Sequence, residues 1–358
     1  MITTVIPTFR RPQLLQRAIT SVLAQRHHAF QIKIFDNASG DETEQVVAAF
    51  QRAGHPIGYF KHATNLGLVD NIIFGIGQIE TPYFSVLSDD DMLAPDFFSA
   101  ALTAFARYPD ASLCLTDSIR VDKRNRILTG PTQSELTGSI RYFGPGAGFI
   151  AAARGEIPAP WIGTMFRREV ITAVGLPNPK AGPSINDNFV LRALARLPCA
   201  VCASLGCVVM ENTESVGYSI GALSGEWPAW WIATADDIEQ DKLVAEEVRA
   251  QARALLVPDF RKLAVRQVLQ GLGRFGVADI AYARRAAQGA AECGFRYTAK
   301  ALKSLIGMYE RFDMIRSLVD RAALVRKTKS GIARDAAEKR YLPYVSFLTA
   351  LSDAGQLK

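Results

Sequence analysis

Apolar runs alternate with helix-like patterns along the first part of the chain. The run at 2–6 precedes apolar positions at helical spacing over 14–23. The same order recurs after the runs at 31–35 and 57–60, and a fourth run follows at 83–87. Strands that alternate with helices of this length predict a mostly parallel sheet with right-handed crossover connections.

Polar residues follow each of these predicted strands. Pro7 and Thr8 follow the first, Asp36 the second, Asn65 the third and the aspartates at 89–91 the fourth. Ligands of parallel α/β sheets collect beyond the carboxyl ends of the strands. We therefore expect these residues to converge on one crevice.

The aspartate run after the fourth strand is the strongest chemical signal. Carboxylates about 4 Å apart repel one another by roughly 1–4 kcal/mol per pair, so a run of three, Asp89 to Asp91, favours a bound cation. Oxygen ligands suit Mg²⁺ or Mn²⁺. The alternative is a solvated loop in which Asp91 or Asp96 only caps the helix that begins at Pro95.

The middle of the chain is less regular. Apolar runs at 113–117 and 119–128 predict two further strands. The segment at 144–160, rich in small residues, predicts a mobile or irregular stretch. Strand character resumes at 161–166.

Helical patterns dominate the rest of the chain. Asn186 and Asp187 stand before apolar residues at helical spacing over 189–194. From Ala229 to Leu351 the pattern is almost wholly helical.

Composition describes a globular protein, with 49% hydrophobic and 21% charged residues. We find neither a basic leader before an apolar stretch nor an apolar segment long enough to span a bilayer, and expect a cytoplasmic protein. The five cysteines favour reduced thiols. Cys199 and Cys202 have the spacing of zinc ligands, but the four histidines lie far upstream.

Charge is unevenly divided. Residues 225–358 carry 22 Lys and Arg against 16 Asp and Glu, which accounts for the whole net charge of +6. This asymmetry suggests a neutral catalytic half followed by a basic, mostly helical domain that faces an anionic partner.

Several motifs, in order, resemble those of the inverting GT-A glycosyltransferases of family 2. The donor-side motifs are 5–11, 36–41, 65–71 and the aspartate run, which resembles the DXD region. On the acceptor side, the segments 163–167 and 186–192 resemble a strand and the helix that carries the catalytic acid. The resemblance covers about residues 1–220. It implies a Rossmann-like α/β domain over 1–224, with the helical appendage at 225–358.

The resemblance also implies a metal-dependent, inverting transfer of a sugar from a nucleotide-diphosphate sugar, with a UDP-sugar favoured, to an acceptor hydroxyl in bacterial polysaccharide or glycoconjugate synthesis. Asp90, with Asp91 in support, would bind Mn²⁺ or Mg²⁺. Asp187 would be the general base. The remaining roles, at the base, the ribose and the phosphates of the donor, fall on Pro7, Thr8, Arg10, Asp36, Asn65 and Asp89.

Three departures from the family pattern leave alternatives open. Ser88 stands where a strict DXD has its first acid, and Asn186 stands where many members have Glu. Asn212 and Glu214 fill a region where many members have a histidine. Which carboxylate binds the metal, and how strictly the metal is needed, therefore stay open.

Rival functions are less well supported. A dinucleotide oxidoreductase needs a Gly-rich turn after the first strand, which Pro7-Thr8-Phe9-Arg10 does not supply. The alternative from another class is a non-catalytic glycosyltransferase-like module that binds a partner or an anionic membrane through its C-terminal helices. For the enzyme we expect a carbohydrate or lipid-linked acceptor and no nucleic acid, with peripheral contact at the inner face of the cytoplasmic membrane as an open alternative.

Overall fold

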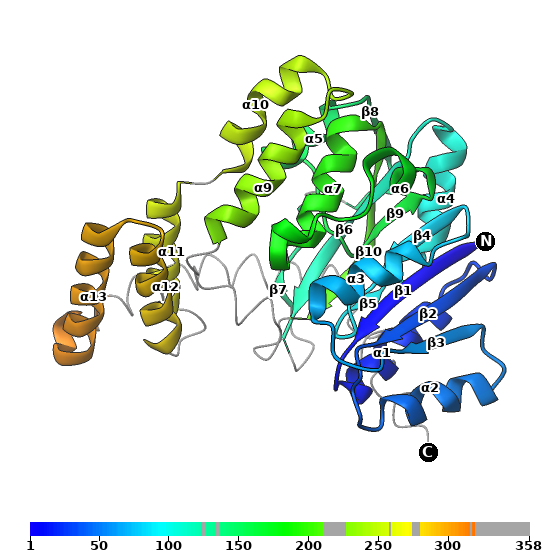
Figure 1. Cartoon of the computed structure of the whole chain (residues 1–358), viewed down its shortest axis with the longest axis horizontal. Coiled ribbons are helices and arrows are strands. Elements are labelled where there is room, and N and C mark those ends of the chain that lie inside the picture. The colour runs from blue at the N-terminus through cyan, green and yellow to red at the C-terminus, as the bar shows by residue number, and fades with distance from the viewer. Residues whose placement is uncertain are drawn as a thin grey trace.

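The structure is a computed structural model that describes residues 1–122, 127–132, 136–210, 227–257, 259–273, 280–315 and 317–318 (Figure 1). Its described strands form one sheet in the order β3-β2-β1-β4-β9-β6-β10-β5, with β7 on β6 and β8 on β10. The strands are β1 (Ile2–Thr8), β2 (Phe30–Asp36), β3 (Ile57–Lys61), β4 (Tyr83–Val86), β5 (Met92–Leu93), β6 (Leu113–Val121), β7 (Ile127–Thr129), β8 (Ile140–Phe143), β9 (Thr164–Arg167) and β10 (Cys199–Met210).

The first half of the sheet is parallel, as the sequence predicts. Strands β3, β2, β1 and β4 pair in parallel, and Thr8 at the end of β1 lies opposite Asp36 at the end of β2. Helices α1 (Pro12–Leu23), α2 (Thr43–Arg52) and α3 (Leu68–Gly77) connect them. Their apolar faces, with Leu15, Ile19 and Val47 fully buried, pack into the main core.

The second half of the sheet is mixed. Strand β9 runs antiparallel to both β4 and β6, whereas β10 pairs in parallel with β6. Strand β6 is continuous over 113–121, so the prediction of separate strands at 113–117 and 119–128 is wrong. Pairing with β9 and β10 on its two sides holds this run extended, an effect that local periodicity does not encode.

Part of the segment expected to be irregular forms an α-helix, α5 (Ala147–Ala153), so that expectation is wrong over 147–153. The structure assigns neither helix nor strand to residues 154–160. Phe149 of this helix is fully buried, and burial of its apolar face overrides the weak local pattern. The other helices over the sheet are α4 (Phe97–Arg107), α6 (Glu169–Val174), the 3₁₀ helix η1 (Pro179–Ser184), α7 (Ile185–Arg196), α9 (Trp227–Gln240) and α10 (Glu246–Leu256).

A second core lies in the C-terminal helices α11 (Phe260–Gly273), α12 (Ile280–Glu292) and α13 (Arg296–Arg311), which are drawn to one side of the sheet in Figure 1. Helices α9 and α10 instead contribute Ala235, Ile238 and Val248 to the main core. The boundary at residue 224 stays a prediction, and the packing favours a later one near Val257, which contacts both cores. None of the described helices is long and apolar enough to cross a membrane.

Candidate active site

The ends of β1 and β4 meet through a buried polar contact. Thr8 Oγ1 donates a hydrogen bond of 2.8 Å to Asp89 Oδ2, and the two residues are only 3% and 6% exposed. This contact exists because parallel neighbours in the sheet end at the same edge. It brings together two of the residues that the sequence assigns to the donor site.

Arg11 connects this pair to the next aspartate. Its Nη1 atom lies 3.1 Å from Asp89 Oδ1 and 3.1 Å from Asp90 Oδ2. One guanidinium therefore offsets the charge of two of the three clustered carboxylates. Arg11 had no predicted role of its own, although a cation directly after the first strand, together with a later run of aspartates, indicates such a contact.

The pKa of Asp89 lies close to neutral pH. Burial and the neighbouring charge of Asp90 raise the pKa of Asp89 to about 6, while Arg11 and the hydrogen bond from Thr8 act in the opposite direction. Its ionisation therefore depends on Arg11 and on whatever else reduces the local negative charge.

Asp91 points into the protein. Its Oδ1 atom accepts a hydrogen bond of 2.8 Å from the backbone N–H of Met210, at the end of β10, and the residue is 4% exposed. Burial, followed by the charge of Asp90, raises the pKa of Asp91 well above its usual value. In this position Asp91 anchors the aspartate run to β10, and its assignment as a metal ligand stays a prediction.

Asp36 is held by its own turn and by the adjacent strand. Its Oδ1 atom accepts hydrogen bonds from Ser39 N (2.9 Å) and Ser39 Oγ (2.5 Å), and its Oδ2 atom accepts one of 2.6 Å from Tyr59 Oη. Burial and the contact with Asp36 raise the pKa of Tyr59, so it stays a donor. Asp36 is thus fixed in orientation at the sheet edge.

The loops after β1, β2 and β3 form one rim. Arg10, with a positive φ of 54°, donates from its backbone N–H to Ser39 Oγ (2.9 Å) and from Nε to Ser39 O (3.1 Å). Asn65 Oδ1 accepts hydrogen bonds of 2.8 Å from Asn37 Nδ2 and from Gly67 N. Pro7 is half-buried one residue before the end of β1. The predicted donor-site residues therefore all lie at the same edge of the parallel half.

Asp187 lies on the other half of the site, in the first turn of α7. The residue as a whole reaches the protein surface, but desolvation of its carboxylate by burial raises the pKa of Asp187 to about 6. The charge of Arg120, near the end of β6, lowers the pKa of Asp187 and also acts on Asp91. Arg120 thus links the two acidic sites electrostatically, a role that the sequence analysis missed.

Helix α7 is fixed by the residues beside Asp187. Asn188 is fully buried and donates hydrogen bonds to Asp237 Oδ2 (2.9 Å) and Thr234 Oγ1 (3.2 Å), both on α9. Asn186 Oδ1 is buried and has no hydrogen-bond partner among the described residues. The contacts of Asn188 with α9 therefore fix the first turn of α7, which carries Asp187. The Asn186 Oδ1 atom lies one residue before it.

Close backbone packing fixes the strands under this half. A Cβ atom at Gly206 would lie 1.7 Å from Thr116 Oγ1, so β10 approaches β6 as only glycine allows. Thr116 Oγ1 in turn donates a hydrogen bond of 2.5 Å to Gly163 O, just before β9. These contacts fix the positions of β6, β9 and β10 relative to one another, and Arg120 lies on β6.

Residues 3–170 match the family model described as glycosyl transferase family 2. This region is a glycosyl transferase family 2 domain. An uncharacterized glycosyltransferase of Rickettsia felis is 33% identical over 98 residues, which are 27% of this chain and 16% of that protein. The GalNAc(5)-diNAcBac-PP-undecaprenol beta-1,3-glucosyltransferase of Campylobacter jejuni is 33% identical over 90 residues, 25% of this chain and 29% of that protein. The chain thus covers less than a third of the length of these relatives.

Solved structures resemble the chain over a longer range. S. aureus TarS 1–349 in complex with UDP-GlcNAc has a TM-score of 0.59 at 13% identity, covering 87% of this chain and 91% of that one. The longer TarS structure gives a TM-score of 0.55 at 12% identity, over 90% of this chain and 55% of that one. This likeness confirms the predicted GT-A fold.

The aspartates of the family 2 domain fit a divalent cation in their chemistry. The Arg11 guanidinium between Asp89 and Asp90 shows that these carboxylates accept a positive charge. Within the described ranges, however, no three His, Cys, Asp or Glu side chains gather as a metal site. The predicted contacts of Asn212 and Glu214 lie outside the described residues.

Proposed function

We propose that this protein is an inverting glycosyltransferase that transfers a sugar from a nucleotide-diphosphate sugar to an acceptor hydroxyl. The observation that carries the proposal is the cluster of Thr8, Arg11, Asp89 and Asp90 at one sheet edge, with Asp187 on the helix beyond. The match to glycosyl transferase family 2 over residues 3–170, a range that includes this cluster, supports the proposal.

The donor site would lie on the rim formed after β1, β2 and β3. An ionised carboxylate offers about four acceptor positions. Asp36 can therefore accept a hydrogen bond from an N–H of the base and still accept those from Ser39 and Tyr59. Pro7, Thr8, Arg10 and Asn65 would complete the site, and Asp89 would reach the ribose. The UDP-GlcNAc bound by TarS supports a UDP-sugar as the donor.

Charge on the departing diphosphate needs compensation. Asp90 would hold Mn²⁺ or Mg²⁺ with Asp91 in support, and the metal would supply positive charge to the phosphate oxygens. Arg11 would move from the two carboxylates toward the diphosphate, or share them with the metal, as ligands enter. The metal and Arg11 would together offset the negative charge of the leaving group.

Asp187 would act as the general base. The acceptor oxygen forms a bond to the anomeric carbon as its proton passes to the Asp187 carboxylate, and the bond from that carbon to the diphosphate oxygen breaks with its electron pair on the nucleotide. Attack opposite the leaving group inverts the configuration. A pKa of about 6 leaves Asp187 ionised at neutral pH yet basic enough to accept the proton.

The acceptor is proposed to be a carbohydrate or a lipid-linked saccharide of bacterial polysaccharide or glycoconjugate synthesis. The undecaprenol-linked substrate in the name of the Campylobacter jejuni relative supports a lipid-linked acceptor. We further propose that the protein acts in the cytoplasm or at the inner face of the cytoplasmic membrane, with the C-terminal helices at the acceptor side.

Calorimetry with a panel of nucleotide diphosphates and their sugars, with and without Mn²⁺, tests the donor site. We expect metal-dependent binding of one nucleotide to the wild type and loss of that dependence in Asp90→Ala. Asp187→Asn should abolish transfer while nucleotide binding survives. No binding of any nucleotide would favour the non-catalytic module, and equal transfer by Asp187→Asn would remove that residue from the mechanism.

A further inference from the structure

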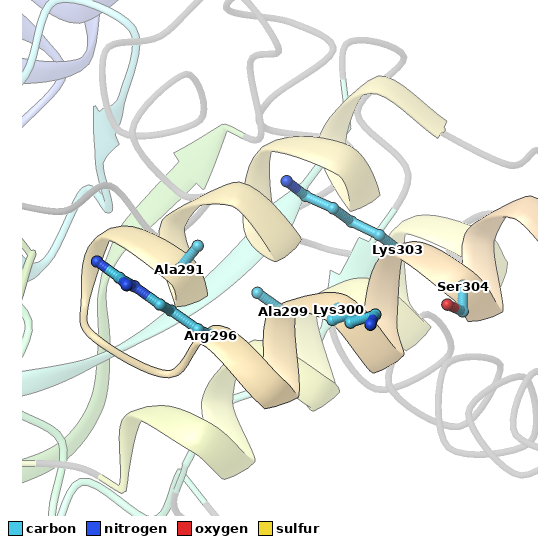
Figure 2. A pocket seen from close by; sticks show the side chains of 6 residues that line it. All are labelled: Ala291, Arg296, Ala299, Lys300, Lys303 and Ser304. Carbon is cyan, nitrogen blue, oxygen red and sulfur yellow. The ribbon is translucent and has the colours of Figure 1, made fainter.

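A basic groove lies on the C-terminal helices, away from the residues discussed so far. Its volume is about 470 Å³. Figure 2 shows the side chains that line it, at the end of α12 and along one face of α13. The groove is lined by Ala291, Arg296, Ala299, Lys300, Lys303 and Ser304. The two alanines have short side chains, and the three cationic side chains supply the charge of the groove (Figure 2).

Among the described residues, the cations of the groove have no acidic partner. Arg296, Lys300 and Lys303 share one face of α13 because they are four and three residues apart. Across the part of the chain that the structure describes, no carboxylate forms an ion pair with any of them, and Lys303 donates a 2.9 Å hydrogen bond to the neutral Gln288. Arg284 on α12, by contrast, pairs with Glu310 at 2.7 Å. The groove therefore favours an anionic partner.

Exposed apolar side chains adjoin the groove. Tyr297 on α13 is 92% exposed and Met308 is 41% exposed, and helical spacing places both along one stripe beside the cations. Phe312 and Met314, just past the end of α13, are 55% and 70% exposed. A soluble phosphate would satisfy the cations but would leave this apolar stripe in water. A lipid surface offers phosphate headgroups and an apolar boundary together.

We propose that the α12–α13 groove docks the protein on the anionic surface of a lipid bilayer. Arg296, Lys300 and Lys303 contact headgroup phosphates, and Tyr297 and Met308 enter the interface between headgroups and acyl chains. Each cation near such a surface strengthens partition by roughly fivefold. Docking depends on the groove and its apolar stripe, and so does not depend on the transferase activity.

Co-sedimentation of the full chain with vesicles tests this surface. We expect binding to vesicles that mix phosphatidylcholine with phosphatidylglycerol, weak binding to phosphatidylcholine alone, and release by salt. The triple variant Arg296→Gln, Lys300→Gln, Lys303→Gln should lose at least tenfold in partition. The matched control removes three exposed cations of the sheet domain and of the α9–α10 connection, with the substitutions Arg52→Gln, Lys180→Gln and Lys242→Gln, and should bind as the wild type does.

A second variant separates the apolar contribution from charge. Tyr297→Ser with Met308→Ser keeps every cation and should still weaken binding, most clearly at salt concentrations that screen the groove. If the wild type binds vesicles equally well at low and high salt, and with or without anionic lipid, the proposal is overturned before any variant is tested. It also fails if the triple variant and its control bind alike, or if soluble pyrophosphate binds the groove while vesicles do not.

Discussion

Thr8 and Asp89, 81 residues apart in the sequence, are joined by a buried hydrogen bond of 2.8 Å at the edge of the parallel sheet. The contact fixes the first aspartate of the run against β1, and Arg11 then reaches both Asp89 and Asp90. The donor side of the site is therefore one connected unit, in which loss of one member changes the charge state of the others.

Arg11→Gln should weaken nucleotide-diphosphate binding by roughly tenfold or more, because a hydrogen bond to a charged group contributes about 1.5–3 kcal/mol. Removal of this cation also raises the pKa of Asp89 further, so the loss should grow as the pH falls toward 6. Calorimetric titration with UDP between pH 6 and pH 8 measures both effects.

Arg26→Gln is the matched control for Arg11→Gln. Arg26 forms an exposed ion pair with Asp96 at 2.8 Å, so the substitution removes the same kind of charge pair outside the site. Exposed pairs contribute little, and we expect unchanged affinity. Equal affinity of Arg11→Gln and the wild type at every pH would show that Arg11 is only a structural counter-ion.

The pH profile of transfer should fall on its acidic side near pH 6. The raised pKa of Asp187, about 6, means that the base takes up a proton below this pH, which lowers kcat. Asp89 shares this pKa but serves the donor, so its protonation should raise KM. Separate kcat and KM measurements from pH 5 to pH 8 distinguish the two groups. A kcat that stays flat down to pH 5 contradicts the role of Asp187.

Ionisation of Asp187 should raise kcat but lower the free energy of unfolding. A carboxyl whose pKa is higher in the folded than in the unfolded state destabilises the fold once it ionises. The contribution of Asp187 to stability is therefore greatest below about pH 4, and it is lost as the pH rises from about 4 to about 6. Asp187→Asn should melt at a higher temperature than the wild type at pH 7, and the difference should shrink toward pH 4. A lower melting temperature of the variant at pH 7 would contradict this linkage.

Arg120→Gln should move the acidic limb of the kcat profile to higher pH. The charge of Arg120 lowers the pKa of Asp187, so its removal lets that pKa rise and leaves less of the base ionised. Arg52→Gln, an exposed cation on α2, should leave the limb in place. A purely structural role for Arg120 predicts lower kcat at all pH values without a shift of the limb.

The convergence of the donor residues could be predicted because it follows from topology alone. Parallel strands end at one edge, so Thr8, Asp36 and Asp89 had to approach each other once the alternating pattern was recognised. Family motifs then supplied the roles.

The orientation of individual side chains could not be predicted in the same way. Asp91 turns from the crevice to the backbone of Met210, 119 residues away, because β10 happens to end beside the aspartate run. That neighbour depends on the mixed strand order β4-β9-β6-β10, which local periodicity does not encode. The continuous β6 and the helix α5 were missed for the same reason, since both depend on tertiary packing.

Gly206→Ala should destabilise the sheet domain by about 1–3 kcal/mol, the usual cost of overpacking. The new methyl group would lie 1.7 Å from Thr116 Oγ1 and 2.6 Å from Thr116 Cβ, so β10 must move away from β6. Thermal unfolding followed by circular dichroism measures the change. Adding Thr116→Ala removes the nearer of the two clashing atoms and should restore part of the loss, whereas additive losses would mean that another contact is responsible.

Gly307→Ala gives the matched control, because nothing lies within 4 Å of the Cβ position at this residue of α13. Alanine favours a helix over glycine by about 1 kcal/mol, so this variant should be as stable as the wild type or more so. Displacement of β10 in Gly206→Ala also carries the backbone of Met210 away from Asp91. We therefore expect that variant alone to lose nucleotide affinity, and unchanged affinity would show that the aspartate run does not depend on its anchor to β10.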